Sequence, residues 1–135
     1  MTKQEHIEYW LFRRIVPTTS KDDLESAFAI FNSGKYFWSL FIAQLSLEKL
    51  LKAFWVKDNE LNFPPKTHDL NKIAKETNLS LPDADKEFLA EVSAFNIEAR
   101  YPDYKKKFSE RCTQDFAKTY LFEIKEFIEC TLKKM

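Results

Sequence analysis

The sequence predicts an all-α fold, an up-and-down bundle of five to six helices. Two observations carry this prediction: the 135 residues include a single glycine, and apolar residues recur at helical spacing almost throughout the chain. Tight turns between strands usually need residues with positive φ, so one glycine argues against sheets. Thirteen phenylalanines, five tyrosines and three tryptophans indicate a core of large rings. We expect a single domain over residues 1–135.

Charge and composition limit the classes of function. Lysine plus arginine equals aspartate plus glutamate, 21 each, whereas a dominant nucleic-acid footprint would be basic overall. Local basic patches are compatible with this balance. Cys112 and Cys130 form no recognisable spacing and are expected to be reduced thiols. The N-terminus lacks an apolar signal core and no apolar run reaches a membrane span, so we expect a cytoplasmic protein without membrane contact.

The first two helices are predicted on either side of Pro17. One is expected over about Gln4–Ile15, and Pro17 closes that segment. Thr18–Ser20 then supplies an N-cap for the second helix. Its stripe at i, i+3, i+4 and i+7 is Leu24, Ala27, Phe28 and Phe31, and the helix ends at Gly34, a left-handed C-cap.

The third helix is expected over about Tyr36–Lys57. Its apolar residues cover most of the circumference, which is typical of a central helix packed on several sides. The loop from Asn59 to Lys66 contains two prolines and cannot be helical. Thr67 is then the expected N-cap of a short fourth helix.

Two further helices complete the predicted bundle. The fifth starts at Leu81–Asp83 and ends before Pro102, because a residue preceding proline is pushed out of the α region. Its stripe is Phe88, Leu89, Val92, Phe95 and Ala99. The last helix is expected over about Ser109–Lys133, with Phe116, Tyr120, Ile124, Phe127 and Ile128 on its buried side.

Three polar residues of the third helix form one row. Gln44, Glu48 and Lys52 are spaced four apart on an otherwise apolar helix. One interpretation is a solvated stripe with an ordinary Glu48–Lys52 pair, worth about 0.3–0.5 kcal/mol. The other is that the row lines a ligand-binding groove facing Arg100 or a partner chain.

Arg100 ends the fifth helix and is the leading candidate for ligand contact. It can bind orphan carbonyls at the helix end, or offer a bidentate fork to phosphate. Asp103, Tyr104 and Lys105 follow directly. The lysines at 105–107 are either a solvated loop or part of a small phosphate-binding patch that includes Arg100.

Catalytic and metal chemistry have few candidates in this sequence. His68 is expected to have a capping or surface role, and acid–base catalysis would require the fold to bring it near Arg100. No cluster has metal-ligand spacing, and one glycine rules out a glycine-rich phosphate loop. We therefore expect no metal and no cofactor.

The order of five short motifs resembles the HEPN family over roughly residues 20–132. Each motif is weak by itself, but their order is specific. The motifs are Asp23-Leu24 with Ala27, Gly34-Lys35-Tyr36, Gln44 with Glu48-Lys49 and Lys52-Ala53, Pro65 with Thr67-His68-Asp69-Leu70, and Ala99-Arg100-Tyr101-Pro102-Asp103.

The resemblance implies a helical bundle that commonly forms homodimers. Many family members are metal-independent ribonucleases, often toxins, and others are encoded beside a small nucleotidyltransferase that acts as antitoxin or partner. The ribonucleases use an arginine, a polar residue, and a histidine four to six residues beyond the arginine. Arg100 matches the arginine, but Tyr101 replaces the polar residue and lysines occupy 105–107.

The sequence thus favours binding over catalysis. The first hypothesis is a homodimeric module that binds nucleotide or RNA phosphate through Arg100, paired with a nucleotidyltransferase in a toxin–antitoxin-type system. The alternative is a metal-independent endoribonuclease toxin with a substituted site, using Arg100 with His68 or a lysine. A third interpretation is an interaction subunit without a ligand.

Overall fold

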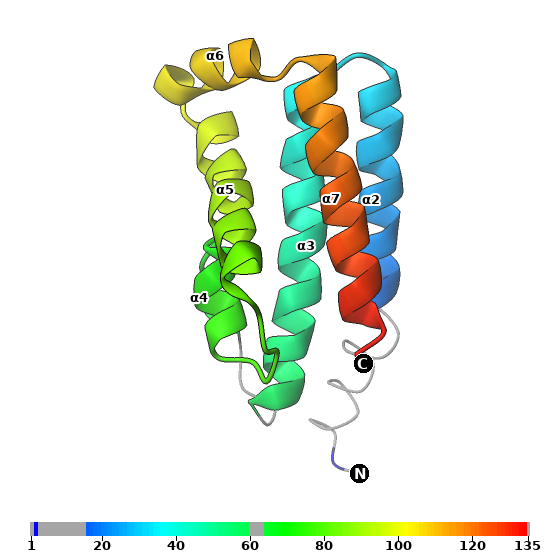
Figure 1. The fold of residues 1–135 in the computed structure, drawn as a ribbon, viewed down its shortest axis with the longest axis vertical. Helices are drawn as coiled ribbons and strands as arrows, with labels where there is room; N and C mark the ends of the chain where they lie inside the picture. The colour runs from blue at the N-terminus through cyan, green and yellow to red at the C-terminus, as the bar shows by residue number, and fades with distance from the viewer. Residues whose placement is uncertain (1, 3–15, 60–63, 135) are drawn as a thin grey trace.

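The bundle predicted from the sequence is present. The computed structural model describes residue 2 and residues 16–59 and 64–134, and these contain helices and no strand. The helices are α2 (Val16–Asn32), α3 (Tyr36–Asp58), α4 (Leu70–Lys75), α5 (Asp83–Arg100), α6 (Pro102–Arg111) and α7 (Gln114–Leu132). The four long helices run up and down, α4 lies beside the first half of α5, and α6 crosses one end (Figure 1). The helix expected over 4–15 lies outside the described residues.

The centre of the bundle is α3, as its apolar circumference predicts. It contacts α2, α4, α5, α6 and α7. Five fully buried apolar residues lie along one face of the helix: Leu40, Ala43, Leu47, Leu50 and Leu51. Further buried residues, among them Ser46, Ala53 and Val56, extend around the axis on either side of this face. Neither α3 nor any other helix in the described ranges meets the length and apolarity that a bilayer span requires.

The start of α2 differs from the prediction. The helix begins at Val16, so Thr18–Ser20 lies within it and is not an N-cap. Pro17 is tolerated because amide groups in a first helical turn have no intrahelical partner. The buried Ser20 hydroxyl instead donates to the Ser46 carbonyl at 2.9 Å, and the Ser46 hydroxyl donates to the Ser20 carbonyl at 2.7 Å. These two reciprocal hydrogen bonds hold α2 against α3.

The turn between α2 and α3 depends on Gly34, as predicted. Its φ is +84°, in the left-handed region, and its amide donates to the carbonyl of Phe31 at 3.0 Å. A β-carbon at this position would meet no atom within 4 Å. A substitution here therefore strains the backbone without causing a steric clash.

We expect Gly34→Ala to lower the free energy of unfolding by about 1–2 kcal/mol, the cost of a left-handed conformation for an ordinary residue. Gly34→Asn should lose less, because asparagine tolerates this region. Urea denaturation followed by circular dichroism measures both. Equal stability of the alanine and asparagine variants would contradict the backbone explanation.

The prediction of one long last helix is wrong, because α6 precedes α7. Pro102 occupies the start of α6, where its missing amide hydrogen costs nothing and its fixed φ suits a helix. The lysines at 105–107 are thus helical rather than part of a loop. Cys112 ends α6, and the Thr113 hydroxyl caps α7 by accepting from the Phe116 amide at 3.2 Å.

Aromatic rings join the last three helices. Phe95 of α5 stacks against Phe108 of α6, with centroids 5.2 Å apart, and meets Tyr120 of α7 edge-on at 5.1 Å. The Tyr120 hydroxyl also donates to the Glu91 carboxylate of α5. Burial, with this hydrogen bond, raises the pKa of Tyr120 to about 12. The core of large rings expected from the composition therefore lies where α5, α6 and α7 meet.

Candidate functional site

The polar row of α3 lies inside the bundle. Gln44 is fully buried and Glu48 is 7% exposed, while Lys52 is half-buried. The Lys52 ammonium is 3.3 Å from Oε2 of Glu48. The interpretation as a solvated stripe is therefore wrong for Gln44 and Glu48, which meet the segment before α4 and the face of α5.

His68 lies against this row. Its Nδ1 is 2.7 Å from Oε1 of Glu48, and its side chain is 42% exposed. In its neutral form, an imidazole that donates from Nδ1 to a carboxylate has Nε2 available as an acceptor, which is the arrangement of an oriented base. Contrary to expectation, His68 does not cap α4. Asp69 is the N-cap, because its side chain accepts from the amides of Asn71 and Lys72. The Thr67 hydroxyl accepts from the Asp69 amide.

Asn96 completes the buried network and was not predicted. Its amide donates to Oε1 of Gln44 at 3.1 Å, and Nε2 of Gln44 in turn lies 3.4 Å from Oε1 of Glu48. A usable signal was present in the sequence, since Asn96 follows Val92 by four residues and so falls on the apolar stripe of α5. A polar residue at such a position needs a buried partner.

Arg100 lies one turn beyond Asn96 and does not reach the row. It is exposed, and its guanidinium carbon is 6.0 Å from the centroid of the Phe41 ring. Phe41 precedes Glu48 by two turns of α3, roughly 10 Å along the axis. The fold therefore places Arg100 beside Phe41 and His68 beside Glu48, and the structure records no contact between Arg100 and His68.

The first turn of α6 lies beside the start of α3. Nζ of Lys105 is 4.8 Å from the Trp38 ring centroid and 5.4 Å from that of Phe37. Tyr101 and Tyr104 are 57% and 56% exposed, and Trp38 is 38% exposed. We refer to Trp38, Arg100, Tyr101, Tyr104 and Lys105 together as the Arg100 surface.

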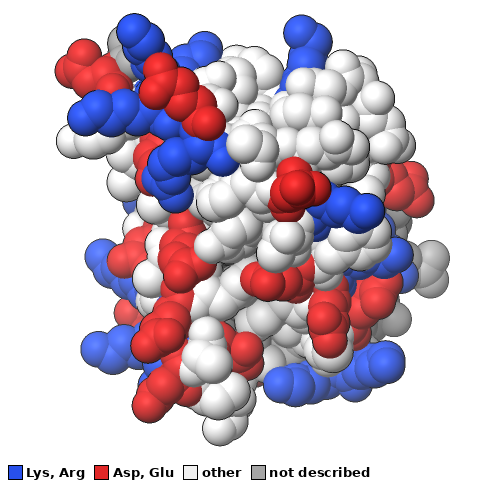
Figure 2. Space-filling model, turned by 45° about the horizontal axis from the view of Figure 1, so that its top comes forward, with Lys and Arg blue, Asp and Glu red and all other residues white. Residues whose placement is uncertain are grey.

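The cations of the Arg100 surface form no ion pair with a described carboxylate. Among the described residues, the ion pairs are Lys49–Asp23, Lys52–Glu48, His68–Glu48 and Arg111–Glu98. Neither Arg100 nor Lys105 takes part in one, and nor does Asp103. Figure 2 shows blue and red side chains intermixed at the upper left, so the charge of this view is mixed rather than uniformly basic.

The described part of the chain shows no site for a metal ion or a cysteine nucleophile. No group of three or more histidine, cysteine, aspartate or glutamate side chains there could hold a metal ion. Both cysteines are free, and burial raises the pKa of Cys112 to about 12. That thiol stays protonated near neutral pH and is not a nucleophile.

Comparison with known proteins identifies a family for this chain. A family model described as the HEPN domain matches residues 16–135. No curated protein and no solved structure matches the chain. The matched range includes every candidate residue named above.

Proposed function

The chain belongs to the HEPN family, and on that basis we propose that it is a binding module whose Arg100 contacts RNA or nucleotide phosphate without competent catalysis. The observation that carries this proposal is the environment of Arg100 and Lys105. Both cations lie over aromatic rings, and neither is paired with a carboxylate among the described residues. A cation held this way keeps its hydrogen-bond donors available for an incoming anion.

The neighbouring rings suit a nucleic acid better than a simple anion. Tyr101 and Tyr104 are exposed beside Arg100 and Lys105, and aromatic side chains stack on bases at about 1–3 kcal/mol per base. A guanidinium can meet two phosphate oxygens at once. The Arg100 surface thus offers aromatic rings for the bases and cations for the phosphates of a single-stranded nucleic acid.

Binding is favoured over cleavage by the separation of the candidate groups. The segment 105–107 supplies lysines rather than a histidine, and lysine at its ordinary pKa is a poor base near neutral pH. His68, the histidine that the structure describes, contacts Glu48. Glu48 lies about two turns of α3 from Phe41, whose ring lies against Arg100.

We expect Arg100→Ala to weaken binding of a labelled single-stranded RNA oligonucleotide at least about tenfold, measured by fluorescence anisotropy at low salt. The matched control is Arg111→Ala, which removes an arginine already paired with Glu98 at 3.2 Å and should change affinity little. Equal affinity of the Arg100→Ala variant and the unmodified protein would contradict the proposal. Gel analysis of the same RNA reports cleavage.

The Glu48–His68 pair favours a second candidate function, a metal-independent endoribonuclease. In this case RNA would span the distance between Arg100 and His68, with Arg100 binding one phosphate and the oriented imidazole acting at another. Loss of cleavage in both Arg100→Ala and His68→Ala would favour this function over simple binding.

The proposed partners rest on different grounds. Most of the apolar circumference of α3 is covered by the other helices of its own chain, so the circumference as a whole gives little support to a homodimer. Support for the proposed homodimer comes instead from exposed apolar residues on neighbouring helices, Trp38, Ile97 and Tyr101. The proposed nucleotidyltransferase partner and the toxin–antitoxin role rest on the family, whereas the cytoplasmic location stays an expectation from the sequence.

A further inference from the structure

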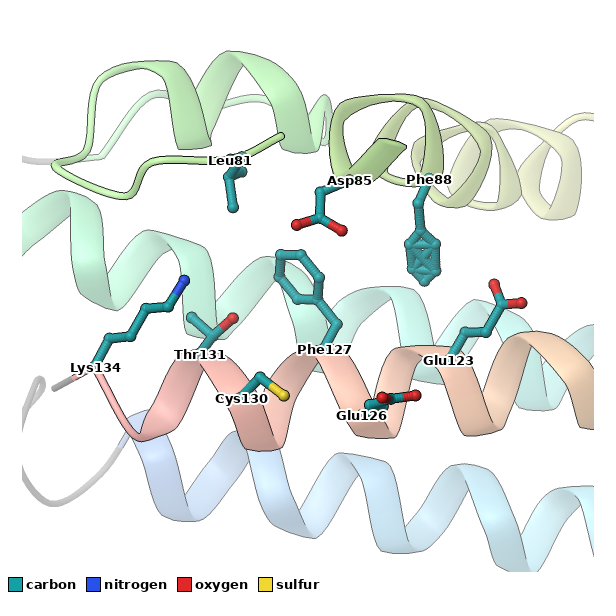
Figure 3. Close-up of a pocket in the computed structure, with 9 residues that line it drawn as sticks. All are labelled: Leu81, Asp85, Phe88, Glu123, Glu126, Phe127, Cys130, Thr131 and Lys134. Carbon is teal, nitrogen blue, oxygen red and sulfur yellow. The ribbon is translucent and has the colours of Figure 1, made fainter. Parts of the chain in front are cut away.

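A separate hollow lies between the start of α5 and the end of α7. Its volume is about 360 Å³, within the range of small-molecule sites. Figure 3 shows Asp85 and Phe88 pointing from α5 toward α7, and Phe127 and Glu123 pointing back from α7. Asp85 and Arg100 are at opposite ends of α5, roughly 20 Å apart along the helix. The hollow is therefore distinct from the Arg100 surface.

The wall of the hollow is acidic. Asp85, Glu123 and Glu126 line it together with a single cationic side chain, Lys134. None of these four groups forms an ion pair within the described ranges. Three unpaired carboxylates around one opening attract a cation.

Aromatic rings form the floor beneath the carboxylates. The centroids of Phe88 and Phe127 are 6.1 Å apart, and both rings are half-buried. Phe88 also stacks on Tyr120 at 6.2 Å with an interplanar angle of 10°, which holds its ring in place. Such a floor accepts an aliphatic stem, and its faces attract organic cations.

Thr131 gives a second, independent indication of a ligand. Its side chain is 3% exposed and lines the hollow, and Figure 3 shows its hydroxyl oxygen directed toward it. That hydroxyl has no hydrogen-bond partner among the described residues, although buried hydroxyls are normally paired. It can donate or accept a hydrogen bond from a molecule placed there.

We propose that this hollow binds an organic cation on an aliphatic stem, either a linear polyamine or an arginine side chain of a protein segment. The ammonium or guanidinium lies among Asp85, Glu123 and Glu126, and the stem lies against Phe88 and Phe127. The Thr131 hydroxyl accepts a hydrogen bond from the cation. A simple metal ion fits less well, because no group of three or more histidine, cysteine, aspartate or glutamate side chains in the described ranges could hold one.

Isothermal titration calorimetry of the full chain tests the proposal with two probes, spermidine and a short arginine-containing peptide. Binding of spermidine identifies a free polyamine as the ligand source, and binding of the peptide identifies a protein segment. Glu126→Gln, an exposed and structurally mild change, should weaken binding about tenfold. Thr131→Val should weaken it several-fold without lowering the melting temperature, because the hydroxyl has no protein partner to lose.

The matched control is Glu129→Gln, which removes an exposed carboxylate of α7 that does not line the hollow. It should leave the affinity unchanged. The proposal is overturned if neither probe binds at millimolar concentration. It is equally overturned if Glu129→Gln weakens binding as much as Glu126→Gln, since the attraction would then come from the general charge of α7.

Discussion

Phe95→Ala will lower the free energy of unfolding by about 3–5 kcal/mol, the range for truncating a fully buried phenylalanine. Phe95 is 1% exposed and meets rings of α6 and α7, so alanine leaves a cavity where three helices join. Urea denaturation followed by far-ultraviolet circular dichroism measures the loss.

Phe122→Ala is the matched control for this prediction. Phe122 lies on α7 but is 50% exposed, and its removal should cost less than about 1 kcal/mol. If both alanine variants were equally stable, the junction of α5, α6 and α7 would not be the tightly packed part of the core.

Asn96→Ala will destabilise the fold by about 1–3 kcal/mol, although the side chain is polar and uncharged. The change removes the donor to Oε1 of Gln44 and leaves that carbonyl buried without it. Asn71→Ala is the control, since Asn71 donates to the Lys86 carbonyl in an exposed setting where water can replace it. Thermal and urea unfolding of both variants give the comparison.

A double variant separates this network from simple packing. Gln44→Leu combined with Asn96→Leu removes both buried partners, so it should cost less than the sum of the two single changes. Strict additivity would show that the contact between Gln44 and Asn96 contributes nothing to stability.

The helices that the sequence predicted well are those with a clear apolar period. The stripe from Phe88 to Ala99 and the apolar circumference of α3 each identified a helix, and the predicted bounds lie within a residue or two of those observed. Helix ends were harder to predict, because several neighbouring residues can cap. Asp69 rather than Thr67 caps α4, and Pro17 lies inside α2 rather than before it.

The helix α6 escaped prediction because its sequence is mostly polar. The three lysines resemble a solvated loop, and Phe108, which is fully buried, was too weak a signal to define an apolar face. Its helical state follows from Pro102 at its start and from the docking of Phe108 against Phe95. The second contact involves another helix and is not visible in local spacing.

The sequence predicted several residues of the candidate site, but not which of them contact one another. The spacing of Gln44 and Glu48 places them on one face of a helix, yet the residues that cover this face lie far along the chain. Asn96 is 52 positions from Gln44, and His68 is 20 positions from Glu48. Helical periodicity gives the direction of a side chain, whereas its neighbour depends on the order in which the helices pack.

The buried contacts of α3 also constrain how this protein can diverge. A change at Gln44 to an apolar residue leaves the buried amide of Asn96 without its hydrogen-bond acceptor. A change at Glu48 removes the carboxylate that both His68 and Lys52 contact. A substitution at one of these positions should therefore be accompanied by substitutions at the positions it contacts. In related sequences, positions 44 and 96 should covary, and a lineage that loses the carboxylate at 48 should also lose the histidine at 68.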